Sequence, residues 1–159
     1  MDIYQDILKE IKKIPVIDTH EHLPSKEQNI DQERDILKEY LSHYMSSDLI
    51  SSGLNPEKLE QVKDASIPIS KRWEMVETNW EMCRYTGYGR ALDIAVRKIY
   101  GVDCIKKETI NTLNRKFKEK NKPGHFEYVL KNLCGIKLSI LDAWDSIKIF
   151  NLEDIVTYY

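Results

Sequence analysis

Two short apolar segments with strand character, separated by about 110 residues of helical pattern, constrain the fold of this chain most. The first, residues 15–20, is a β-branched run that begins with a proline, and that proline ends the helical pattern before it. The second, residues 136–142, alternates apolar and polar side chains and then becomes apolar throughout. Parallel strands need a long crossover, which helices fill well, so we expect the two strands to lie side by side and parallel.

The spacing of apolar residues predicts helices before and between these strands. The expected helices span residues 2–13, 36–52, 56–63, 70–86, 90–100, 110–117 and 125–133, with an extended piece at 147–150 and a weak helix at 152–159. The step Gly87-Tyr88-Gly89 does not follow a strand and is too short for a phosphate-binding loop, so we interpret it as a turn between helices. The prediction is a mostly helical α/β chain.

The composition is that of one soluble domain. The chain has 159 residues, of which 42% are hydrophobic and 31% charged, so it can bury a core without metal or disulfide staples. Its net charge of −2 gives no basic excess and argues against nucleic acid as a partner.

The chemistry of the chain ends and of the cysteines favours a cytoplasmic location. The chain has three cysteines, an odd number at wide spacings, which suits reduced thiols: Cys83, Cys104 and Cys134. The N-terminus carries two acids where a secretory signal carries positive charge, and no apolar run approaches the 18 residues of a membrane span. We therefore expect no membrane partner, while self-association into a homo-oligomer stays open.

The pattern that carries chemistry is Asp18-Thr19-His20-Glu21-His22, at the C-terminal end of the first strand. Residues two apart on a strand share a face with Cα atoms roughly 6.6 Å apart, so His20 and His22 can bind one metal ion. Asp18 is expected on the same face, where its carboxylate can accept a ring N–H and fix the tautomer of a ligand, while Glu21 points the other way. His-x-His also arises by chance in about 7 of 100 such chains, and a solvent-facing or core-satisfied pair is the alternative.

Residues 14–23, Ile-Pro-Val-Ile-Asp-Thr-His-Glu-His-Leu, resemble the first barrel strand of the amidohydrolase superfamily. These are metal-dependent hydrolases on a (β/α)8 barrel whose first strand ends in His-x-His. A long helical insertion after strand one, here residues 24–124, is similar to that of the uronate isomerase-like and amidohydrolase-related branches. Residues 84–92 and 133–142 look like segments of bacterial members. The resemblance implies an incomplete TIM-type barrel, with the first two parallel strands separated by the insertion.

The resemblance also implies a divalent metal, Zn²⁺ first of all, with His20 and His22 as ligands and a small-molecule substrate. Family sites add a histidine after strand five, another after strand six and an aspartate after strand eight, and this chain offers no strands that match them. His43 and His125 lie on predicted helices and are not carried over. The general base therefore stays unknown, and we expect the chain to be the N-terminal part of a larger enzyme, inactive alone.

The reaction implied is hydrolysis of an amide, ester or lactone by a metal-activated water. Isomerisation of a sugar acid and decarboxylation are alternatives within the same superfamily. A different class of function, a non-catalytic helical interaction module with an incidental His-x-His, is favoured by the dominance of helical pattern.

Two arginines in the helical region are weaker candidates for binding substrate. Arg84 and Arg90 flank the glycine step, and helices inserted after the first barrel strand lie over the mouth where substrates bind. A guanidinium there can bind a carboxylate with two hydrogen bonds, and a solvated helix face is the alternative. We interpret Trp73, Trp80 and Tyr85 as helix-packing aromatics, with a platform for substrate as the alternative.

Overall fold

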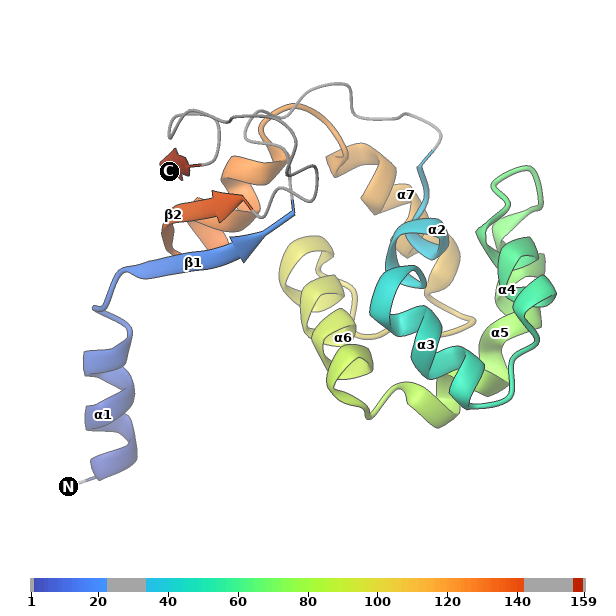
Figure 1. Ribbon diagram of the computed structural model, residues 1–159, viewed down its shortest axis with the longest axis horizontal. Helices are drawn as coiled ribbons and strands as arrows, with labels where there is room; N and C mark the ends of the chain where they lie inside the picture. Colours follow the sequence, from blue (N-terminus) through green and yellow to red (C-terminus); the bar gives the residue numbers. More distant parts are fainter. Residues whose placement is uncertain (1, 23–33, 142–155, 159) are drawn as a thin grey trace, which may run out of the picture. The chain divides into compact units, whose positions relative to one another are not determined.

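A computed structural model describes residues 2–22, 34–141 and 156–158 (Figure 1). The chain divides into two compact units. The strand unit comprises Met1–Ile30 and Pro123–Tyr159, and the helical unit comprises Asp31–Lys122. The helical unit falls within the insertion expected over residues 24–124.

The strand unit contains a three-stranded sheet in the order β1-β2-β3. Its elements are α1 (Ile3–Ile11), β1 (Val16–Glu21), the π-helix η1 (Glu127–Leu133), β2 (Ile136–Leu141) and β3 (Val156–Tyr158). The pairing of β1 with β2 is parallel, which confirms both predicted strands and their relative direction.

The sequence prediction for the end of the chain was wrong where the structure describes it. Val156, Thr157 and Tyr158 form β3, antiparallel to β2, where a weak helix was expected. β-Branched and aromatic residues favour strands when a neighbouring strand offers hydrogen bonds, and β2 supplies that neighbour. The extended piece expected at 147–150 lies outside the described residues.

Helix α1 begins where its sequence signals place it. The Asp2 side chain accepts hydrogen bonds from the backbone N–H groups of Tyr4 and Gln5, at 3.1 and 3.4 Å. The helix buries none of its residues, and its apolar side chains Ile3, Ile7 and Ile11 are 55 to 68% exposed. The apolar stripe of α1 therefore adds little to the core of the strand unit.

The helical unit is built from six described helices around one core. These are α2 (Ile36–Tyr40), α3 (His43–Ser51), α4 (Pro56–Lys63), α5 (Ile69–Cys83), α6 (Gly87–Tyr100) and α7 (Ile110–Lys120). The helix expected over 36–52 is two helices, broken between Tyr40 and His43, where His43 takes a φ of 50°. Both helices contribute apolar residues to the same core, Ile36 and Leu37 from α2 and Met45 and Leu49 from α3, so the apolar spacing continues through the break and does not reveal it.

Two tryptophans occupy the core of the helical unit, as predicted. The rings of Trp73 and Trp80 lie 6.3 Å apart at their centroids and are almost completely buried. Tyr85 is 74% exposed, so the packing interpretation was wrong for this residue. None of the described helices is long and apolar enough to span a bilayer.

A buried ion pair joins three helices of this unit. The Asp35 carboxylate caps α2 by accepting from the N–H groups of Leu37 and Lys38, and it binds the Arg72 guanidinium of α5 at 3.1 and 2.6 Å. Arg72 also donates to the carbonyl oxygen of Val62 in α4. Both charged side chains are only 3% exposed. The attraction between the two charges therefore has to offset the free-energy cost of removing each of them from water.

We predict that Asp35→Ala lowers the free energy of unfolding by about 3–5 kcal/mol, because it leaves the Arg72 charge buried and unpaired. Urea denaturation followed by far-UV circular dichroism measures this loss. Glu60→Ala is the control, since it removes an exposed ion pair with Lys63 and should change stability by less than about 1 kcal/mol. Equal effects of the two substitutions would contradict the role of the buried pair.

The two glycines at the start of α6 have different surroundings. A Cβ atom on Gly89 would lie 2.5 Å from the Cys83 carbonyl oxygen and 2.7 Å from the Arg84 Cα, both backbone atoms. A Cβ atom on Gly87 would meet nothing within 4 Å. The interpretation of Gly87-Tyr88-Gly89 as a turn was wrong, because these residues form the first turn of α6 and the turn between the helices precedes Gly87. Gly89 permits the close approach of α6 to the end of α5.

We predict that Gly89→Ala destabilises the helical unit by about 1–3 kcal/mol, because backbone has to move. Gly87→Ala should leave stability unchanged or raise it by up to about 1 kcal/mol, because alanine restricts the unfolded chain. Thermal unfolding of both variants measures the contrast. Similar melting temperatures would contradict the close approach.

Candidate metal site

His20 lies near the C-terminal end of β1 and His22 directly follows the strand, and the two side chains come together. Their ring centroids are 4.7 Å apart, with the ring planes at 85°, and both residues are solvent-exposed. Two imidazoles that share one Zn²⁺ in tetrahedral geometry have ring centres about 5 Å apart, given Zn–N bonds of 2.0–2.1 Å. The separation of the two rings is thus that of two imidazoles on one divalent cation, and it is also that of an edge-to-face ring contact.

The expected alternation of side chains along β1 was wrong at this point. Asp18 pairs with Ser139 and Glu21 pairs with Leu141, so three steps along β1 match two steps along β2. With one extra residue between them, Asp18 and Glu21 lie on the same face of β1. These two are also the half-buried residues of β1. The cause is a local register shift, here called the bulge, in which β1 has one extra residue between Asp18 and Glu21; an opposite shift, with one extra residue in β2, lies between Val16 and Ile17. Periodicity alone does not reveal either shift.

Each acidic side chain holds the backbone of one candidate ligand. The Asp18 Oδ1 atom accepts a hydrogen bond from the His20 N–H at 3.2 Å. The Glu21 Oε1 atom accepts from the His22 N–H at 2.7 Å. Asp18 was expected to contact an imidazole N–H, whereas this bond is to backbone. Sequence reasoning missed Glu21, because its position depends on the bulge.

The other histidines lie elsewhere in the fold. His43 begins α3 in the helical unit, and His125 precedes η1 in the strand unit. Within residues 2–22, 34–141 and 156–158, no three His, Cys, Asp or Glu side chains gather closely enough to hold a metal ion. The described part of the site thus consists of the two imidazoles and the two carboxylates that support them.

Arg84 has carboxylate partners within its own unit. Its Nη1 atom contacts both carboxylate oxygens of Glu81, at 3.1 and 3.2 Å, and its Nη2 atom lies 3.6 Å from Asp93. Burial disfavours the charge, but the hydrogen bonds to Glu81 and Cys104 and the nearby Asp93 raise the pKa of the Arg84 guanidinium above its ordinary value. These contacts favour a structural role for Arg84, while Arg90 is exposed.

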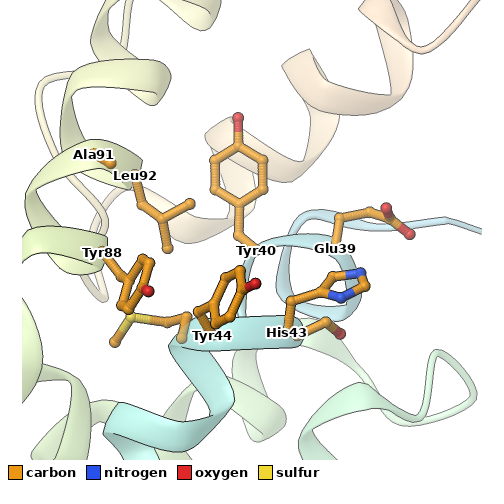
Figure 2. Close-up of a pocket in the computed structure, with 9 residues that line it drawn as sticks. Glu39, Tyr40, His43, Tyr44, Tyr88, Ala91 and Leu92 are labelled. Carbon is orange, nitrogen blue, oxygen red and sulfur yellow. The ribbon is translucent and has the colours of Figure 1, made fainter. Parts of the chain in front are cut away.

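A shallow pocket of about 210 Å³ opens on the helical unit (Figure 2). Tyr44 and Tyr88 stack at one side of it, with ring centroids 5.1 Å apart and planes at 8°. Burial, with help from Tyr100, raises the pKa of Tyr40 far above its ordinary value, so this phenol stays protonated and is no base. The pocket is smaller than the roughly 300–1,000 Å³ of ordinary ligand sites. The histidine pair is therefore the stronger candidate site.

Comparison with known proteins adds no relative: no family model, no curated protein and no solved structure matches this chain.

We predict that Arg84→Ala lowers the free energy of unfolding by about 1–3 kcal/mol, because the Asp93 carboxylate loses a positively charged neighbour. Asp93 is buried, with 4% of its surface exposed. Arg90→Ala should change it by less than about 0.5 kcal/mol, as at other exposed positions. Chemical denaturation of the two variants provides the comparison. An Arg84→Ala protein as stable as the parent would instead favour the substrate-binding interpretation.

Proposed function

We propose that this chain supplies two metal ligands, His20 and His22, to the active site of a metal-dependent hydrolase of the amidohydrolase type. The observation that carries the proposal is the convergence of the two imidazoles at the C-terminal end of a strand in a parallel pair. Barrel enzymes bind their substrates at that end of the strands. In the proposed fold, β1 and β2 are the first two strands of a (β/α)8 barrel, and the helical unit is an insertion between them.

The proposed reaction is hydrolysis of an amide, ester or lactone. A divalent cation, with Zn²⁺ favoured by imidazole ligands, supplies a bound water with a pKa of about 7 and polarises a substrate carbonyl. His20 and His22 would hold the cation as neutral imidazoles. Three protein ligands plus water is the usual catalytic minimum, so we expect weak metal binding and no turnover from these two residues alone. Sugar-acid isomerisation and decarboxylation use the same kind of site and stay as alternatives.

A second candidate function belongs to the helical unit. Its continuous core and its buried Asp35–Arg72 pair suit a helical interaction module that needs no metal. The two proposals differ in what His20 and His22 do, because a module of that kind makes no use of a paired imidazole site.

We predict that Zn²⁺ added to the ¹⁵N-labelled chain shifts the imidazole signals of His20 and His22 together. The His20→Ala, His22→Ala double variant should bind Zn²⁺ more than about tenfold more weakly, since it lacks both ligands. Long-range ¹H–¹⁵N correlation spectra identify which imidazole rings respond to Zn²⁺. They therefore distinguish Zn²⁺ binding by the histidines from Zn²⁺ binding by the cysteines.

The matched control is a His43→Asn, His125→Ala double variant, which removes the other two histidines. Asparagine is used at position 43 because it tolerates the left-handed backbone found there. This control should bind Zn²⁺ like the parent. Equal affinity in the His20, His22 double variant and the parent would reject the hydrolase proposal and favour the helical module.

A further inference from the structure

Two carboxylates on one face of β1 support two imidazoles by way of the backbone. The Asp18 and Glu21 side chains accept from the N–H groups of His20 and His22, at 3.2 and 2.7 Å. Each candidate ligand is thus held at its own peptide N–H by an acidic neighbour within two positions. The rings of the same two residues meet at 4.7 Å between centroids.

The bulge explains why acidic side chains occupy these places. Between Asp18 and Glu21, β1 has one residue more than β2. A regular ladder of hydrogen bonds between the two strands therefore cannot include every peptide group of this stretch. At this irregular stretch the carboxylates of Asp18 and Glu21 accept from the backbone N–H groups of His20 and His22. Asp18 and Glu21 are the half-buried residues of β1, whereas His20 and His22, which donate to them, are exposed.

We propose that Asp18 and Glu21 are positioning residues whose carboxylates fix the bulged backbone so that the His20 and His22 rings meet at one cation. The proposed role of each carboxylate is its bond to a backbone N–H, with no part as a metal ligand. The cation in this proposal rests on the proposed function, whereas the positioning of the two rings does not.

The two roles make different demands on the side chain. A backbone N–H needs only an oxygen acceptor, which the amides of asparagine and glutamine also provide. A metal ligand or a carboxylate paired with an imidazole relies on negative charge. Asp18→Asn and Glu21→Gln therefore preserve a positioning role and abolish a ligand role, while Asp18→Ala and Glu21→Ala abolish both.

The experiment compares these four variants of the full chain with the parent by two measurements. The first is the nuclear Overhauser effect between the ring protons of His20 and His22 without metal, which reports their proximity directly. The second is the affinity for Zn²⁺, read from the same imidazole signals. Glu10→Ala is the matched control, because it removes an exposed carboxylate of α1 that contacts Lys13. Unchanged backbone amide spectra of the helical unit verify that each variant is folded.

We expect the amide variants to keep the ring contact and to bind Zn²⁺ within about threefold of the parent. The alanine variants should lose the ring contact and bind Zn²⁺ about tenfold more weakly, the lower end of the effect of losing an outer support of a metal ligand. The Glu10→Ala control should match the parent in both measurements.

The outcomes separate this inference from the proposed function. Loss of Zn²⁺ affinity in the amide variants as large as in the alanine variants would overturn it, as would an alanine variant that keeps the ring contact. A parent chain without the ring contact would overturn it as well. A parent with the ring contact, lost only in the alanine variants, but with no Zn²⁺ response would support the positioning role and reject the hydrolase proposal.

Discussion

The parallel pairing of β1 with β2 is the constraint on which the rest of the strand unit depends. Two parallel neighbours cannot be joined by a tight turn, so the chain between them has to form a long crossover. Here about 110 residues intervene, enough to build a separate compact unit. The same pairing also sets the register that produces the bulge in β1. The direction of one strand pair thus governs both the domain organisation and the local shape of the candidate site.

The helical unit buries its apolar side chains in a core made of its own residues. Short helices such as α2 and α4 are marginal by themselves and need tertiary contacts. The Asp35–Arg72 pair caps α2, binds α5 and reaches the backbone of α4, so one buried interaction joins three helices. Because each charge is nearly completely buried, this arrangement tolerates little change, which favours one packing of the helices over others.

The candidate site shows how backbone geometry and side-chain chemistry combine. A His-x-His pair on a regular strand places two rings on one face, but here the strand is bulged and two carboxylates hold the amides of the histidines. The rings nevertheless meet at a distance that fits a shared cation. The support for the proposed metal chemistry is thus local, built within five consecutive residues from Asp18 to His22.

The sequence by itself determined the positions of both parallel strands, the N-terminal helix, the helix that begins at Pro56 and the burial of Trp73 and Trp80, because short-range periodicity and capping fix such features. It also led to the proposal that His20 and His22 are metal ligands, which stays a prediction. Only the tertiary structure decided the break at His43, the strand β3, the internal ion partners of Arg84 and the shared face of Asp18 and Glu21. Strand β3 depends on pairing with β2, and the contact of Arg84 with Asp93 depends on the packing of α6 against α5. A bulge changes the face of a side chain without changing the residue pattern, so no local signal reveals it.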